Sequence, residues 1–447
     1  MSKLIIKDVL DKINGKLVFG NVDDSLDSFE TDSRKIVDNV VFVGIKGENV
    51  DGSKFYLDAL NSGAKGCIIN RGFSNEEEIS GKFLIEVDDT VKALQELAKI
   101  KRSMYDIPVV AVTGSVGKTS TKDIIASVLG TKYNVLKTEG NHNNEIGMPL
   151  TILSLKDHNA MVLEMGMSSF GEISLLSKIA KPTIGVITNI GTAHIGILGS
   201  RENILKAKLE IMDGLDGKLI INNDNDMLHS WNLNNKLNNV ITVGINNKSD
   251  FMASNIISKD DKTTFTCNND IYDINANGEA FVYNSLTAVA ISKLLDIDYN
   301  KTKYGLVNFK LTSGRNEIIK CNGYIVVNDC YNASVDSIKE ALKNLSNSDN
   351  KRKIAVLGDI LELGDFSKEI HKKVGEEVLK NNIDILVTVG NESKIVYDVC
   401  KNSMESYHFD NNKDAINYLK STIKDDDKIL VKASNGMKFI EIVDSLR

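Results

Sequence analysis

Residues 109–121 read VVAVTGSVGKTST and place two glycines between an apolar β-branched run and a helix-forming segment. We expect a buried strand over residues 109–112 and a helix over residues 119–129. In such a strand–turn–helix unit, the loop N–H groups and the helix N-terminus converge on an anion. Lys118 would add a positive charge beside the terminal phosphates, and the Thr119 hydroxyl would reach Mg²⁺. The stretch therefore predicts a phosphate-binding loop within a parallel α/β sheet.

The match to the usual phosphate-loop pattern is incomplete. The pattern G-x-x-x-x-G-K-[ST] requires a glycine at position 112, where this chain has Val112. An ordinary glycine turn followed by a lysine is the alternative interpretation. The strand before the turn and the helix after it favour phosphate binding. We therefore predict that the loop residues contact a nucleotide: Gly114, Ser115, Val116, Gly117, Lys118, Thr119 and Ser120.

The composition indicates a folded protein of several domains. Its 447 residues exceed the ~250 to 300 that one hydrophobic core supports. The net charge of -7 argues against a protein that coats nucleic acid, and the five cysteines contain no C-x-x-C pair. No apolar run approaches the ~20 residues that span a bilayer. We therefore expect a cytoplasmic protein without a signal peptide, a membrane anchor or a nucleic-acid partner.

Three α/β domains are expected. Residues 1–100 combine short strand and helix patterns in a small N-terminal domain, which ends near the charged stretch KIKRSMYDIP at 99–108. In residues 101–310, β-branched runs alternate with helices, which predicts a P-loop-type parallel sheet covered on both faces. Residues 311–447 repeat this alternation and predict a Rossmann-like, doubly wound domain. Asparagine is abundant in residues 222–247, where we expect exposed loops.

Polar residues that follow other strands are candidate site residues, because ligands bind at the carboxyl ends of parallel strands. Glu164 ends the strand pattern AMVLEM and suits Mg²⁺, although a carboxylate there can also form a turn or a cap. His194 follows the strand pattern TIGVITNI, and a structural histidine is the alternative. The polar loop TEGNHNNEIGMPL at 138–150 is either functional or merely solvated.

Two further segments contain candidate site residues, but a purely structural role explains both segments well. The helical pattern ENILKAKLEIM contains Lys208, and helix spacing alone would place this lysine in solvent. The segment NDCYNASVDS joins a strand to a helix and offers Asp329, Tyr331 and Asn332 for hydrogen bonds, as Asx-rich turns commonly do. Neither segment alone decides a function.

Taken together and in chain order, these segments resemble the Mur ligase family. The resemblance is carried by TDSR and FVGIKGENVDG near the start, TGSVGKTSTKD, GNHNNEIGMPL, LEMGMSSFGEI, NIGTAHIGILGSRENILKAK, GEAFVYNSLTA, SGRNE, NDCYNASVDS, VLGDILELGD and a closing VKAS. It covers nearly the whole chain. It is strongest to the members that join D-alanyl-D-alanine to UDP-N-acetylmuramoyl-tripeptide.

The resemblance implies ATP-dependent amide-bond formation in peptidoglycan precursor synthesis. In this family the γ-phosphoryl group passes to the peptide carboxylate, and the incoming amine attacks the acyl phosphate to release phosphate. The implied cofactors are ATP and two Mg²⁺ ions, the implied partners are the two peptide substrates, and we expect a monomer. The identity of the third peptide residue, diaminopimelate or lysine, stays open.

The resemblance also implies a role for individual residues. The residues that would hold ATP phosphates or metal are Lys118, Thr119, Glu164, His194 and Lys208, the last of these as a carbamylated lysine. The residues that would contact or lie beside the nucleotide are Asn284, Arg315, Asp329, Tyr331 and Asn332. Asn143 and Asn144 would lie near the reacting carboxylate. The residues in the domain that binds the UDP part of the substrate are Thr31, Asp32, Ser33 and Arg34.

Two residues depart from the family pattern, and three alternative functions remain to be considered. Val116 and Ser334 stand where asparagine is common in the family, which leaves the local hydrogen bonds in question. The enzyme rivals are the sister ligase that adds the third peptide residue and a folylpolyglutamate synthetase. The D-N-P-R box of the diaminopimelate-adding enzyme is absent. A non-catalytic nucleotide-binding regulator is the rival outside enzymes, and the joint presence of Lys118, Thr119, Glu164 and His194 disfavours it.

Overall fold

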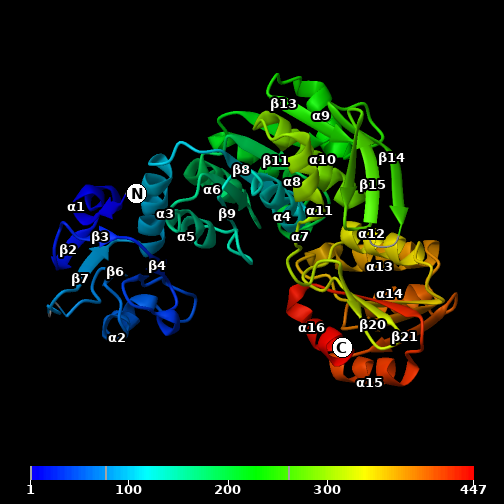
Figure 1. The fold of residues 1–447 in the computed structure, drawn as a ribbon. Helices are drawn as coiled ribbons and strands as arrows, with labels where there is room; N and C mark the ends of the chain where they lie inside the picture. The colour runs from blue at the N-terminus through cyan, green and yellow to red at the C-terminus, as the bar shows by residue number, and fades with distance from the viewer. Residues whose placement is uncertain (1–2, 76–77, 260–261) are drawn as a thin grey trace.

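The computed structural model describes residues 3–75, 78–259 and 262–447 and arranges them in three α/β domains (Figure 1). The N-terminal domain, in blue, and the C-terminal domain, in yellow to red, lie at opposite ends of the green central domain. The main sheets of the three domains have five, nine and six strands in chain order. The predicted three-domain α/β class is therefore confirmed.

The N-terminal sheet has the strand order β2-β7-β6-β5-β4, in which β2 is antiparallel to β7 and the other pairs are parallel. Its elements are β1 (Leu4–Ile5), α1 (Ile6–Val9), η1 (Asp11–Ile13), β2 (Lys16–Phe19), β3 (Ser25–Leu26), β4 (Phe29–Glu30), η2 (Ser33–Lys35), β5 (Val41–Val43), η3 (Gly52–Phe55), α2 (Tyr56–Asn61), β6 (Gly66–Asn70), β7 (Phe83–Val87) and α3 (Thr90–Ser103). The Asp89 carboxylate caps α3 by accepting two backbone N–H groups. This helix packs against α5 and α6 and so joins the first domain to the second.

The central sheet has the order β16-β15-β14-β13-β12-β11-β8-β10-β9, parallel from β9 to β14 and antiparallel at β15 and β16. Its first elements are β8 (Val109–Thr113), α4 (Lys118–Leu129), β9 (Val135–Lys137), α5 (Gly147–Leu153), β10 (Ala160–Glu164), α6 (Glu172–Ala180), β11 (Ile184–Ile187), α7 (Ile195–Leu198), α8 (Arg201–Leu209) and η4 (Glu210–Gly214). The others are β12 (Lys218–Asn222), α9 (Asp226–Asn235), β13 (Val240–Gly244), β14 (Phe251–Lys259), β15 (Lys262–Cys267), β16 (Asp270–Ile274), α10 (Glu279–Leu294) and α11 (Tyr299–Val307). Strand β8 is fully buried because it lies between β10 and β11.

The C-terminal sheet has the order β17-β18-β22-β19-β20-β21, and β17 is its antiparallel edge strand. Its elements are β17 (Glu317–Lys320), β18 (Ile325–Asn328), α12 (Val335–Ser346), β19 (Arg352–Gly358), η5 (Gly364–Phe366), α13 (Ser367–Lys380), β20 (Ile385–Val389), α14 (Lys394–Cys400), β21 (Glu405–Phe409), α15 (Asn412–Thr422), β22 (Asp427–Lys432), η6 (Asn435–Met437) and α16 (Ile440–Ser445). Parallel pairing across β18, β22, β19, β20 and β21 brings the carboxyl ends of these strands to one edge.

Helix α3 spans the domain boundary expected near residue 100, and its buried Arg102 donates to the carbonyls of Ala180 and Lys181. Two local features of the central domain differ from what the sequence predicts. Segment 222–247 is not all loop, because it contains α9 and β13. The antiparallel pairing of β15 and β16 was not predicted either. Among residues 3–75, 78–259 and 262–447, every helix is too short or too polar to span a bilayer.

The connection between the central and C-terminal domains is fixed at both ends. Thr312 donates from its N–H and its Oγ1 to Oδ2 of Asp123, at 3.1 and 2.8 Å. Gly314 has φ +78°, and its carbonyl accepts the N–H of Tyr331 at 3.1 Å. One end of this short segment is thus held by α4 and the other by the C-terminal domain. Arg315, which follows immediately, is directed toward the phosphate loop.

Candidate active site

The phosphate loop joins β8 to α4 at the carboxyl edge of the central sheet. Gly114 has φ +152° and Gly117 has φ +84°, and a Cβ at Gly114 would overlap Oγ1 of Thr188. Gly117 is the N-cap of α4, and no side chain caps this helix. Val112 does not disturb the loop, because β8 continues to Thr113 and Gly114 makes the bend. Backbone geometry and close packing therefore account for both glycines.

Asn189, which follows β11, braces this loop. Its Oδ1 accepts the N–H groups of Ser115 and Val116 at 3.1 and 2.9 Å, and its Nδ2 donates to the Val116 carbonyl at 3.2 Å. Thr188 donates to the same carbonyl at 2.6 Å. The loop conformation is therefore held by side chains at the end of the neighbouring strand, and the Val116 backbone takes part through both its N–H and its carbonyl.

Lys118 begins α4 and folds back over the loop. Its Nζ donates to the Gly114 carbonyl at 2.8 Å. Burial lowers the pKa of Lys118, Glu164 opposes this by stabilising the charge, and Arg315 lowers the pKa further. The lysine thus lies among too few counter-charges, an environment that favours an anionic ligand.

Glu164 connects three parts of the site. Its Oε2 accepts the Thr119 hydroxyl at 2.9 Å, and its Oε1 accepts Nδ2 of Asn143 at 2.9 Å. Nη2 of Arg315 donates to the same Thr119 hydroxyl at 3.3 Å. The carboxylate is only 3% exposed and ends β10, as the sequence predicted. The phosphate-loop helix and the 138–150 loop therefore meet at this carboxylate, and the C-terminal domain joins them through Thr119.

Lys208 and His194 lie close to this cluster. Lys208 is 1% exposed, and both its burial and the nearby charge of Lys118 lower its pKa well below 10.5. Burial and Lys118 also lower the pKa of His194, whereas Glu362 raises it. Nδ1 of His194 lies 2.9 Å from Oε2 of Glu362, without a hydrogen-bond angle. The expectation that a helix lysine would be solvated is wrong for Lys208, because this residue lies on the buried face of α8 with Ile204 and Ala207.

The C-terminal domain contributes a second polar surface. The Arg315 guanidinium lies 4.1 Å from the centre of the Tyr331 ring. Asp329 accepts the Asn316 N–H at 3.1 Å and forms an ion pair with Lys432 at 2.5 Å. Lys432, which is 2% exposed, also donates to the Asn332 carbonyl at 3.1 Å. These contacts fix the loop after β18 against the end of β22.

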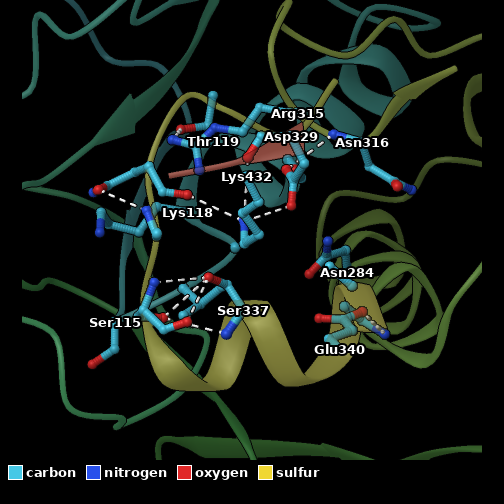
Figure 2. Close-up of a pocket in the computed structure, with 18 of the residues that line it drawn as sticks. Ser115, Lys118, Thr119, Asn284, Arg315, Asn316, Asp329, Ser337, Glu340 and Lys432 are labelled. Carbon is cyan, nitrogen blue, oxygen red and sulfur yellow. Dashed lines mark hydrogen bonds and ion pairs between the residues drawn. The ribbon is translucent and has the colours of Figure 1, made fainter. Parts of the chain in front are cut away.

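Two adjoining cavities open where these surfaces meet. The first cavity runs from the phosphate loop, residues 115–120, to α10 and to one face of α12 (Figure 2). The second cavity begins at Lys118 and continues past Glu164 and His194 to the segments at 360–363 and 434–436. Lys118, Arg315 and Asn332 line both cavities. A long ligand in the first cavity would therefore present its end to a second ligand in the other.

The structure brings most of the sequence-predicted residues to these cavities. Asn284 lines the first cavity, and its Oδ1 accepts the Thr121 hydroxyl at 2.8 Å. Asn144 lines the second cavity but uses Oδ1 to accept the N–H groups of Ile146 and Gly147.

The residues expected to bind the UDP part of a substrate lie elsewhere. The segment Thr31, Asp32, Ser33 and Arg34 follows β4 in the N-terminal domain and lines neither cavity. Arg34 forms two side-chain hydrogen bonds to Asp32, and these bonds lower the pKa of that carboxyl.

Sequence reasoning missed several residues of the site. Lys432 was not predicted as a site residue, although a lysine near the end of the apolar run ILVKAS indicates a charged group at the end of a strand. Asn189 and Glu362 lie in quoted segments, and Asn189 follows a strand pattern as Glu164 does, so position at a strand end was a usable signal for Asn189. Glu340, which lines the first cavity from α12, was likewise missed because it looks like an ordinary helix carboxylate.

Comparison with known proteins identifies the family. The model of the Mur ligase family catalytic domain matches residues 27–102, that of the Mur ligase middle domain matches 112–292, and that of the Mur ligase glutamate ligase domain matches 314–435. The chain belongs to the Mur ligase family. The matched segments of this Mur ligase include the phosphate loop, Glu164, Lys208 and Asp329.

Similar proteins span the whole Mur ligase chain. It is 37% identical to UDP-N-acetylmuramoyl-tripeptide--D-alanyl-D-alanine ligase from Bacillus subtilis, over 100% of this chain and 99% of the relative. The Escherichia coli ligase of the same name is 33% identical, with 100% and 99% covered.

Solved structures agree with this assignment. A MurF structure from Acinetobacter baumannii matches with a TM-score of 0.90 and 26% identity, over 100% of this chain and 99% of that chain. MurF ligase from Thermotoga maritima in complex with ADP matches with a TM-score of 0.81 and 27% identity, over 94% and 96%.

Proposed function

We propose that this Mur ligase joins D-alanyl-D-alanine to UDP-N-acetylmuramoyl-tripeptide at the expense of ATP, in peptidoglycan precursor synthesis. The observation that carries the proposal is the match to two ligases of this specificity over the whole chain. The site supports it chemically, because cationic groups surround a phosphate loop beside a second cavity. We further propose a cytoplasmic monomer that serves cell-wall synthesis and, through it, cell shape and division.

In this proposal the first cavity holds the nucleotide. The phosphate loop and Lys118 bind the phosphates, while Asn284, Arg315 and Asp329 contact the rest of the nucleotide. The solved relative with ADP supports nucleotide binding by this fold. The segment from Thr31 to Arg34 would bind the UDP part of the second substrate, which requires the N-terminal domain to approach the central one.

The donor set fits Mg²⁺. The described residues contain no cluster of three or more His, Cys, Asp or Glu side chains that could hold a metal. Mg²⁺ does not need such a cluster, because it commonly binds one or two carboxylates together with substrate phosphates and water. The Thr119 hydroxyl and Glu164 would hold one ion, and His194 with a carbamylated Lys208 would hold a second. When bound, such ions neutralise the phosphate charge that develops during transfer.

The protein groups mainly position the reactants. Phosphoryl transfer from ATP to the peptide carboxylate gives ADP and an acyl phosphate, and attack by the dipeptide amine then forms the amide and releases phosphate. Lys118 holds the phosphate end at the junction of the two cavities, where the carboxylate can approach in line. Asn143, already bonded to Glu164, lies beside this junction and would orient the carboxylate.

The decisive assay measures phosphate release with each substrate omitted in turn. Phosphate should appear only when ATP, UDP-N-acetylmuramoyl-tripeptide and D-alanyl-D-alanine are all present. Faster turnover with a single amino acid and a UDP-muramoyl dipeptide would instead indicate the sister ligase, and binding without turnover would indicate a regulator. Tripeptides that end in diaminopimelate or in lysine would identify the accepted third residue.

A further inference from the structure

The end of the first cavity away from the phosphate loop is built from two helices of different domains. Helix α12 of the C-terminal domain carries Glu340 and Asn344, which are four residues apart and so lie on one helical face. Both side chains line the cavity together with Ala280 and Asn284 of α10. Figure 2 draws Glu340 and Asn284 at the side of the cavity away from Lys118.

Glu340 supplies a cap that α10 lacks in its own sequence. The N-cap of this helix is Gly278, with φ +114° and no side-chain hydrogen bond. Oε1 of Glu340 accepts the Ala280 N–H at 3.2 Å. A Cβ at Gly278 would lie 2.8 Å from Nδ2 of Asn344, so glycine also leaves room for the amide. One carboxylate oxygen is therefore fixed by the backbone of the central domain, and the whole side chain is held in place.

The other polar atoms of this pair are available to a ligand. Within residues 3–75, 78–259 and 262–447, Oε2 of Glu340 and the Asn344 amide have no hydrogen-bond partner, and both side chains are only partly buried. Burial raises the pKa of Glu340 to about 7. Glu279 of α10 and Asp329 after β18 add to this shift, while Lys432 of β22 and the Ala280 N–H oppose it. Lys343 on α12 is already paired with Glu279 at 2.9 Å.

We propose that Glu340 and Asn344 determine base specificity by reading the amino edge of an adenine. In this arrangement Oε2 of Glu340 accepts from the exocyclic 6-amino group, and the Asn344 amide donates to a neighbouring ring nitrogen. On the edge that carries N7, adenine offers this donor beside the N7 acceptor, whereas a 6-oxo purine offers two acceptors, O6 and N7. The inference rests on the proposed ATP-dependent function, since the phosphate loop fixes which end of the nucleotide reaches α12.

A comparison of ATP with purine riboside 5′-triphosphate isolates this contact, because the two nucleotides differ only in the 6-amino group. Calorimetric titration of the full chain should show ATP binding about 10- to 100-fold more tightly, the value of one hydrogen bond to a charged group. Glu340→Gln should remove most of this preference. Its amide oxygen can still accept from Ala280, but an NH₂ group would then face the 6-amino group. Glu279→Gln, at the same interface but outside the cavity, is the matched control and should keep the preference.

The pH dependence gives a second signature. An amine donor binds the ionised carboxylate, so the ratio of ATP affinity to analogue affinity should rise as the pH increases through about 7. Titration of the phosphates cancels in this ratio because both nucleotides carry the same triphosphate. The ratio should be independent of pH in Glu340→Gln, and Asn344→Ala should lower ATP affinity without removing the pH dependence.

Equal affinities for the two nucleotides in the wild type would overturn this assignment while leaving the proposed function intact. An equal loss of preference in Glu279→Gln would also overturn it, because the effect would then come from the interface. Failure of both nucleotides to bind would contradict the proposed function itself and, with it, this inference.

Discussion

Replacement of Lys208 by methionine tests whether this buried lysine lowers the stability of the protein. This side chain is 1% exposed and has no hydrogen-bond partner among the described residues. A buried polar group without a partner costs about 1 to 3 kcal/mol, and more when it is charged. Methionine keeps the length of the side chain and removes the charge. In CO₂-free buffer near pH 7, Lys208→Met should therefore raise the free energy of unfolding by about 1 to 3 kcal/mol.

The sign of the pH dependence follows from the lowered pKa. Lys208 binds its proton less tightly in the folded protein than in the unfolded chain, so wild-type stability should rise as the pH increases from the lowered pKa toward 10.5. The methionine variant lacks this contribution, and its advantage should vanish at high pH. Urea unfolding from pH 7 to 10 measures both chains, with the exposed Lys206→Met as the control. A variant that is less stable at pH 7, or a difference independent of pH, would refute the reasoning.

The same position tests carbamylation. Neutral lysine reacts with CO₂, and its lowered pKa makes the neutral form accessible. Bicarbonate with Mg²⁺ should therefore stabilise the wild type and leave Lys208→Met unchanged. Lys208→Ala should lose about 10²-fold or more in turnover and recover part of it when short-chain carboxylic acids are added. Full activity of Lys208→Ala without any additive would contradict carbamylation.

Three further predictions concern the rest of the site. Lys118→Ala should lower kcat by about 10²-fold or more while the circular dichroism spectrum stays native, because its charge matters once phosphates are bound; near-normal turnover would exclude the phosphate-loop role. Small-angle scattering should show a smaller radius of gyration when an ATP analogue and the UDP-linked substrate are both present, and an unchanged radius would argue against domain closure. Asp123→Ala should cost about 3 to 5 kcal/mol in urea unfolding, because Lys122, 3.3 Å away and equally buried, loses its counter-charge and Thr312 loses its acceptor; a loss below about 1 kcal/mol would show that these contacts are not needed.

The sequence predicted the parts of the site that are local. The phosphate loop follows from one strand, two glycines and one helix, all contiguous in the chain. Glu164 was found because it ends a strand, and parallel strands bring such ends together. Val112 departs from the sequence pattern but does not disturb the fold, because Gly114 makes the bend that the pattern assigns to an earlier glycine.

The remaining features depend on tertiary contacts that sequence periodicity does not encode. Lys208 has the spacing of a solvated helix lysine, and only the family resemblance indicated its role. Asn189 braces the loop from a neighbouring strand, and Glu362 meets His194 across a domain interface. Arg102, two residues past the expected domain boundary, likewise owes its burial to tertiary contacts, because its charged side chain donates to a backbone carbonyl of the central domain.

The clustered positive charges of the site are unfavourable in the unliganded protein and become favourable when a triphosphate binds. Arg315 lowers the pKa of Lys118, and Lys118 lowers the pKa of Lys208, so the positive charges of the unliganded site disfavour one another, and Glu164 opposes this only at Lys118. A triphosphate brings several negative charges to the same place, and a carbamate on Lys208 would reverse one of the positive charges. Triphosphate binding then relieves the repulsion among the cationic side chains of the unliganded site. Part of the affinity for the ligand therefore comes from positive charges that the fold has already brought together. Such a site gives up stability in the absence of substrate in order to hold highly charged reactants in line when they arrive.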